Sequence, residues 1–329
     1  MNRILMILLA TILICGRTSA QTVTFRFEEG TLSDASLREK MEKRISSLLS
    51  EITKASKANQ PLNFDFPYLT SSARMRLAQQ WENMHFSCDD TQIVEKCLPA
   101  INGYVVRDIL VTIHPADNSY DGPKSSELAI CFDANGFITS VRMALESSVR
   151  QDVLAKSHDT DDFHKRMEIL WFIEELHSYY DEKDLKSLHN VFSKDALVII
   201  NNVVLRKNMD TDQTIVSPEI LCRKFDNNDY MKRLTALFNN NKFIKVRFDE
   251  ISVRKHPAKP GFYIVTLHQT ISAGGKVENG YMYMLWEFRE NQPPIIHFRT
   301  WLSEMENGHS QTLDEKFLDE DLGTCTSPW

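Results

Sequence analysis

The sequence predicts an α+β protein in which helices pack on a curved antiparallel sheet, arranged as two tandem cone-like domains. Its 329 residues suffice for two domains of ordinary size. Amphipathic helices open both halves, and the second half closes with four long strands in succession, at 242–255, 261–272, 279–289 and 294–302. A composition of 42% apolar and 25% charged residues excludes collagen, a coiled coil and wholesale disorder.

Residues 1–20 have the pattern of a cleaved export signal. Asn2 and Arg3 precede an apolar run at 4–14, and Thr18-Ser19-Ala20 is a small-x-small cleavage site before Gln21. The apolar run is too short to span a bilayer, so no transmembrane segment is expected. Cys15 raises the alternative of a lipid anchor, which Ile14 disfavours because a small residue is expected there. We therefore expect export to the periplasm or the extracellular space.

The charge balance argues against a nucleic-acid partner. Loss of residues 1–20 removes Arg3 and Arg17 and leaves 36 basic and 45 acidic residues, a net charge of −9. A negative chain without a basic stripe is a poor ligand for phosphate backbones. The acidic stretch 305–329 predicts a solvated C-terminal tail.

Cysteine usage is sparse for an exported chain. Five cysteines follow the signal and no CxxC motif occurs, which argues against thioredoxin-like chemistry. A disulfide between Cys88 and Cys97 is left open by the sequence.

The first half, residues 21–156, begins with a short strand at 22–27. Apolar residues spaced by three and four then predict helices at 36–58 and 70–81. Strands follow at 104–113, 127–132 and 137–145, and Asp133-Ala134-Asn135-Gly136 joins the last two as a hairpin. The polar stretch 157–162 marks the predicted domain boundary.

The second half, residues 157–304, begins with a long helix striped by Phe163, Met167, Leu170, Ile173, Leu176 and Tyr180. A short helix at 184–192 precedes two short strands, 196–200 and 203–207, which Asn201-Asn202 predicts to be a hairpin. Ser217-Pro218 predicts the start of a further helix that continues to Phe238. The four long strands come last.

The order helix, helix, hairpin, helix and four strands resembles the nuclear transport factor two-like superfamily, also called the cystatin-like cone. The segment from Phe172 to Leu185 is similar to the opening of that family, a long helix that ends in aromatic residues and an acidic turn, and so is the step from Phe192 to Ala196 into the first strand. The resemblance covers roughly 161–304 and includes ketosteroid isomerase and polyketide cyclase branches. It implies a cone between the long helix and the concave face of the sheet.

A short internal repeat suggests that the first half is a shortened copy of the second. Residues 108–115 (DILVTIHP) and 250–257 (EISVRKHP) share the pattern acidic-Ile-x-Val-x-x-His-Pro at an offset of 142 residues. Both stretches end a predicted strand. The first copy would lack the hairpin at 201–202.

Alternation along the last strands predicts two faces. An apolar face with Met282, Met284 and Trp286 should face the helices, and it offers no general base. The opposite face should carry the candidate binding residues, which are Tyr281, Tyr283, His297, Arg299 and Trp301. Aromatic residues and arginine are typical of interface cores.

These observations predict an exported, non-enzymatic module of the bacterial cell envelope that binds a protein partner or a small apolar ligand. The sheet face would pair the two domains or form a homodimer. The alternative is an isomerase- or hydrolase-like enzyme with its site in the second cone, for which Asp195 and His189 are the candidate catalytic residues. No metal or cofactor is expected, because HExxH, HxH, GxSxG and glycine-rich phosphate motifs do not occur.

Overall fold

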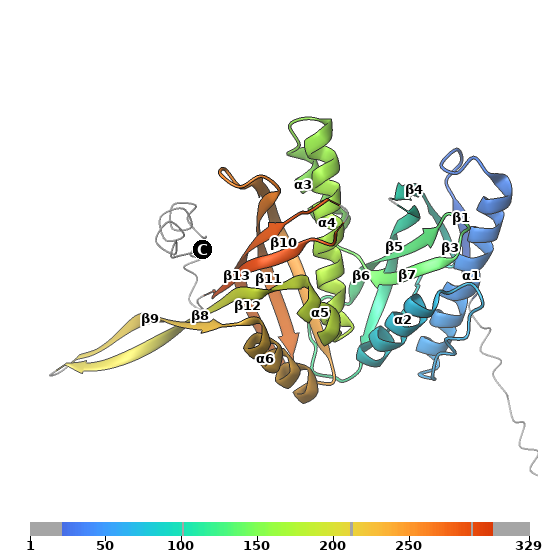
Figure 1. Cartoon of the computed structure of the whole chain (residues 1–329). Coiled ribbons are helices and arrows are strands. Elements are labelled where there is room, and N and C mark those ends of the chain that lie inside the picture. Colours follow the sequence, from blue (N-terminus) through green and yellow to red (C-terminus); the bar gives the residue numbers. More distant parts are fainter. Residues whose placement is uncertain (1–21, 101, 211–212, 291, 305–329) are drawn as a thin grey trace, which may run out of the picture.

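The computed structural model describes residues 22–304 apart from residues 101, 211–212 and 291, and it describes side chains in this range except at 202–220. The predicted export signal and the acidic tail at 305–329 therefore lie outside the described residues. The described chain is α+β, as predicted, and its two halves stand side by side with helix α4 between them (Figure 1).

The elements of the first half are β1 (Thr24–Phe27), α1 (Ala35–Lys57), α2 (Ser71–Asn83), β2 (Met84–Ser87), β3 (Gln92–Glu95), β4 (Cys97–Ala100), β5 (Gly103–Pro115), β6 (Ser125–Asp133) and β7 (Ile138–Met143). Those of the second half are α3 (Ser147–Ala155), α4 (Thr160–Asp181), α5 (Leu185–Val191), β8 (Phe192–Asp210), β9 (Gln213–Phe225), α6 (Asn227–Asn240), β10 (Ile244–Lys255), β11 (Phe262–Ala273), β12 (Lys276–Glu287) and β13 (Ile295–Ser303).

The first half packs two helices on a small sheet. Strands β2, β5, β6 and β7 lie in that order with antiparallel neighbours, and β4 also pairs with β5. The apolar stripe of α1 is wholly buried at Met41, Ile45, Leu48 and Ile52. This spacing of three and four is what predicted the helix, and burial of the stripe supplies most of its stability.

The second half has one six-stranded sheet in the order β10-β11-β12-β13-β8-β9. All neighbours are antiparallel except β13 and β8, which are parallel. The helices cover one face, and the core between them and the sheet includes Ile173, Tyr180, Met284 and Trp286. This arrangement is the predicted cone.

The turn predicted at Asn201-Asn202 does not form. Strand β8 runs unbroken through Asn201-Asn202 and pairs with β9 along the whole register from Val198–Phe225 to Asp210–Gln213. The predicted hairpin at this pair is therefore wrong, and so is the helix start at Ser217-Pro218, which lies within β9. Ladder hydrogen bonds with β9 override the turn preference of asparagine. The β8–β9 hairpin projects from the body of the molecule (Figure 1).

The core of the second half begins before the predicted boundary at residue 157. Leu145 and Val153 belong to this core, and α3 packs against α4 and β10. In the other direction, Phe243 packs into the core of the first half, where its ring lies 5.1 Å from that of Tyr120. The division into separately folding domains stays a prediction.

The internal repeat has a structural counterpart. Asp108 and Glu250, the first residues of the two repeated motifs, both adopt left-handed φ angles, 64° and 50°. Each lies at a bulge, where the register shifts between Val106 and Ile109 in β5–β6 and between Asp249 and Ser252 in β10–β11. Such φ values are uncommon outside glycine. Two occurrences at the same motif position favour the interpretation that β5 and β6 correspond to β10 and β11.

Candidate functional site

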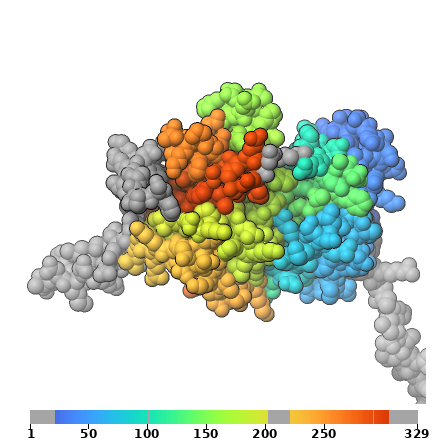
Figure 2. All heavy atoms as spheres, viewed as in Figure 1, coloured from blue at the N-terminus to red at the C-terminus, as the bar shows by residue number. Residues whose placement is uncertain are grey.

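The two halves meet through buried charges that the sequence analysis did not predict. Three arginines of the first half face three glutamates at the C-terminal part of α4: Arg76, Arg107 and Arg142 against Glu174, Glu175 and Glu182. The two halves thus do not pair through the outer sheet face. Figure 2 shows their surfaces in contact along a broad boundary.

Glu174 lies at the centre of this network and is 1% exposed. Both nitrogens at the tip of Arg107 donate to its carboxylate, Arg142 Nη2 donates at 3.1 Å, and the Leu145 amide donates at 3.0 Å. Burial alone would raise the pKa of Glu174, but the two guanidinium charges outweigh it and hold the pKa at about 2. This carboxylate is therefore ionised at neutral pH.

Glu182 is almost as buried as Glu174, but its pKa is shifted in the opposite direction. Burial raises its pKa to about 7, and Arg76 offsets only part of this effect. Arg76 Nε lies 2.8 Å from Glu182, while its Nη1 lies 2.9 Å from Glu175. Because one guanidinium serves two carboxylates, Glu182 is less stabilised in its charged form than Glu174.

A bulge in β13 changes the predicted faces of the second sheet. Trp286 pairs with Ile296, but Leu285 pairs with Phe298, so His297 is the extra residue and the alternation shifts by one. Arg299 and Trp301 therefore pair with Met284 and Met282 and lie on the cone side, where they are 4% and 6% exposed. Their predicted place on the outer face is wrong.

Arg299 has an unusual environment for a buried cation. Its Nε donates to Met282 Sδ at 2.9 Å and its Nη2 to Gln269 Oε1 at 3.2 Å. Its guanidinium carbon lies 5.0 Å from the centre of the Tyr230 ring, whose hydroxyl is 2.9 Å from that of Tyr180. Among the described residues no carboxylate forms an ion pair with Arg299.

The other three predicted binding residues keep the outer face. Tyr283 belongs to a small cluster with Ile264, Leu285 and Phe298 that is separate from the cone core. His297 Nε2 lies 2.7 Å from Glu287, and Tyr281 lies 5.2 Å from the ring of His268. The predicted five-residue surface is thus divided between two faces.

The candidate catalytic residues do not meet inside the cone. Asp195, near the start of β8, and His189, on α5, are both exposed. The His189 carbonyl accepts a hydrogen bond from Asn227 Nδ2 at 3.2 Å, so its backbone rather than its imidazole contributes to packing. This placement does not favour the enzyme alternative.

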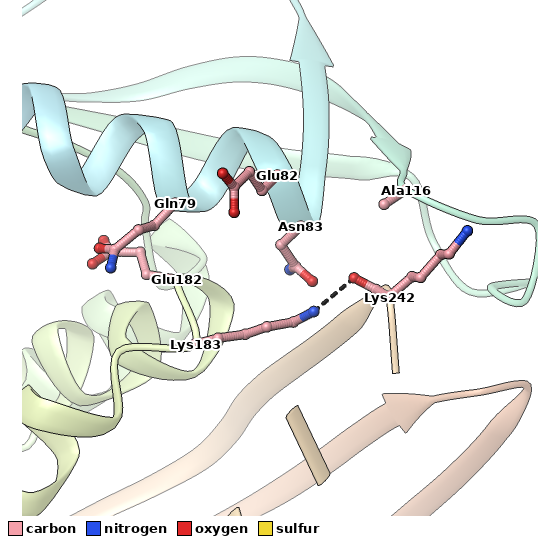
Figure 3. Close-up of a pocket in the computed structure, with 7 residues that line it drawn as sticks. All are labelled: Gln79, Glu82, Asn83, Ala116, Glu182, Lys183 and Lys242. Carbon is pink, nitrogen blue, oxygen red and sulfur yellow. Dashed lines mark hydrogen bonds between the residues drawn. The ribbon is translucent and has the colours of Figure 1, made fainter. Parts of the chain in front are cut away.

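A cleft of about 360 Å³ lies where the two halves adjoin (Figure 3). The first half contributes Gln79, Glu82, Asn83 and Ala116, and the second contributes Glu182, Lys183 and Lys242. These side chains are almost all polar. No part of the sequence pattern predicted the cleft, because its walls are far apart in the chain.

Other expected features can be placed briefly. Cys88 and Cys97 are buried free thiols, so the disulfide left open by the sequence does not form. None of the described helices has the length and hydropathy needed to cross a membrane. Within the described ranges, no three His, Cys, Asp or Glu residues are grouped so as to hold a metal ion.

Comparison with known proteins bears on the fold. No family model and no curated protein matches the chain. Similar solved structures include Bd1075 of Bdellovibrio bacteriovorus, at 11% identity and TM-score 0.34 over 45% of this chain and 44% of that one. The present chain thus spans less than half the length of Bd1075.

Two similar structures come from Novosphingobium aromaticivorans. One is a putative scytalone dehydratase, at 11% identity and TM-score 0.32 over 45% of this chain and 89% of that one. The other is the beta subunit of a putative aromatic-ring-hydroxylating dioxygenase, at 14% identity and TM-score 0.31 over 42% of this chain and 87% of that one. Both are nuclear transport factor two-like proteins, so the chain has neighbours of this fold over part of its length. At these scores the similarity carries no argument about ligand or activity.

Proposed function

We propose that the protein is an exported, non-enzymatic binding module of the bacterial cell envelope, and that its second-half cone binds a small carboxylic acid with an apolar body. The observation that supports this is the buried guanidinium of Arg299, which has no carboxylate partner among the described residues. Burial of an unpaired cation is costly, and a ligand carboxylate would offset that cost with two parallel hydrogen bonds.

The core of the cone holds three buried donors without partners, and one of them belongs to Gln269, whose Oε1 accepts from Arg299. Gln269 Nε2, Trp286 Nε1 and Trp301 Nε1 are buried N–H groups without a hydrogen-bond partner. A carboxylate supplies acceptors for such donors, whereas an amine would add further donors. The ligand would displace Met282 Sδ and the Gln269 amide from Arg299, and its apolar body would contact the aromatic and methionine side chains of the core.

A binding role fits the residues near Arg299 better than catalysis. Tyr180 and Tyr230 are the phenols beside it, and burial raises the pKa of Tyr230 well above its usual value of 10. A neutral phenol is a poor general base at neutral pH. The export part of the proposal rests on the signal pattern of residues 1–20.

Benzoate and its neutral isostere benzamide test the proposal. Benzoate should raise the melting temperature of the full chain in a saturable way, and benzamide should not. Arg299→Met should abolish the benzoate effect, while Arg289→Met, at an exposed arginine in the loop after β12, should leave it intact.

Trp301→Phe serves if the Arg299 variant fails to fold, because it removes one unpartnered N–H and keeps an aromatic ring. It should weaken benzoate binding measured by calorimetry. Equal stabilisation by benzamide, or no saturable effect of benzoate, would contradict the proposal.

A second candidate function is homodimer formation through the outer sheet face. It is suggested by Leu285 and Phe298, the partly exposed members of the outer-face cluster, whose other members Ile264 and Tyr283 are already buried within the chain. Light scattering of the exported protein should then give twice the chain mass, and Phe298→Asp should halve it. A monomeric parent protein would exclude this candidate.

A further inference from the structure

The cleft between the halves is separate from the cone and has no part in the proposed function. Its volume of about 360 Å³ suits a small molecule, and both halves line it. The polar groups of the cleft that lack hydrogen-bond partners indicate the class of ligand that it would bind.

The nitrogen donors of the cleft are largely engaged. Asn83 Nδ2 donates to the Ile244 carbonyl at 2.7 Å, and Asn83 Oδ1 accepts from the Ile244 amide at 2.9 Å. Lys183 Nζ donates to the carbonyls of Asn241 and Lys242 at 2.8 and 2.7 Å. In Figure 3 the ammonium group of Lys242 points away from Gln79 and Glu182.

The oxygen acceptors of the cleft are not satisfied to the same degree. Gln79 Oε1 is buried and has no hydrogen-bond partner. Glu82 is exposed at the rim, where it interacts electrostatically with Lys183 without an ion pair at contact distance among the described residues. Glu182 is 3% exposed and shares the single guanidinium of Arg76 with Glu175. In the view of Figure 3 the side chains of Gln79 and Glu182 overlap, and Glu82 lies one helical turn further along α2.

We infer that this cleft is a binding site for a small organic cation with a primary ammonium group. An ammonium would donate to the unpartnered Gln79 oxygen and to the exposed carboxylate of Glu82, while Glu182, whose oxygens already accept from Arg76 Nε, adds a further acidic group to the lining. A small anion would instead meet two carboxylates and few free donors. Because both halves supply the lining, the bound cation would contact the two halves together.

Three probes of the same length distinguish the ligand classes: 1,4-diaminobutane, the neutral 1,4-butanediol and the dianion succinate. Calorimetry on the full chain should show saturable binding of one diamine, and neither of the other probes should bind. Glu82→Gln, at an exposed position where folding is tolerant, should weaken diamine binding at least about fivefold.

Two variants complete the design. Glu39→Gln, at an exposed glutamate of α1, should leave diamine binding unchanged. Trp301→Phe, which alters the cone, should also leave it unchanged, so failure of the carboxylate proposal would not affect this one. Binding of butanediol or succinate as tight as that of the diamine, no saturable binding, or an unaffected Glu82→Gln variant would each overturn the inference.

Discussion

Replacement of Glu174 by glutamine tests whether buried charges hold the two halves together. The substitution keeps the shape of the side chain and an oxygen that can still accept from the Leu145 amide. It removes the negative charge that Arg107 and Arg142 share. Arg142 retains Glu175 at 2.9 Å, but Arg107 loses the carboxylate that it contacts.

Two estimates of the folding free energy lost in Glu174→Gln agree. The pKa of Glu174 is lowered from 4.5 to about 2, which corresponds to about 3 kcal/mol of folding free energy. Removal of one member of a buried ion pair costs about 3–5 kcal/mol. Because the pKa is lowered by folding, this stability is present above pH 4.5 and is lost as the pH falls towards 2. The difference between parent and variant should therefore shrink in acid.

Urea unfolding at pH 7, followed by circular dichroism, measures the effect. Glu168→Gln is the matched control, since Glu168 lies on the same helix, is about a third exposed and forms an ion pair with Lys165. We expect a loss of about 3 kcal/mol for Glu174→Gln and less than about 1 kcal/mol for the control. Equal losses for the two variants at pH 7, or a difference at pH 3 as large as that at pH 7, would refute the reasoning.

Four further outcomes can be checked. Trp301→Ala should cost about 3–5 kcal/mol in thermal melting, as Trp286→Ala should, and a change under about 1 kcal/mol would return Trp301 to the outer face. Asp108→Gly should raise stability by up to about 1 kcal/mol because it relieves a left-handed φ, whereas Asp108→Ala should not. Sequencing of the exported protein should begin at Gln21, and an acylated Cys15 would contradict this. Limited proteolysis should cut at 157–162, and the fragments should co-elute because ion pairs join the halves.

Regular local patterns account for the elements that the sequence predicted well. The stripe with Met41 and Ile45 in the first half is buried as its spacing requires, and so is the second-half stripe from Leu170 to Tyr180. Phe163 and Met167, which the prediction also placed in the second stripe, are instead 38% and 41% exposed. The hairpin at Asp133 to Gly136 appears where glycine permits positive φ. The α+β class and the succession of the four strands β10 to β13 follow from these signals, since each depends on neighbours within a few residues.

Single-residue shifts and contacts between distant residues account for what the sequence did not predict. One bulge at His297 reverses the alternation of β13, which places Arg299 and Trp301 in the cone although their spacing from Tyr281 and Tyr283 suggested one shared face. No composition signal marks such a bulge in advance.

The sequence alone predicted the fold class, the long helix α4, the four successive strands β10 to β13 and the repeat at the ends of β5 and β10. Only the tertiary structure decided what faces the cone and what joins the halves. Arg107 and Glu174 are 67 residues apart, and Arg76 and Glu182 are 106 residues apart. Charged residues in an amphipathic pattern predict a solvated face of a helix. Here the first half of the chain packs against that face of α4, and this packing turns the charges into a buried network.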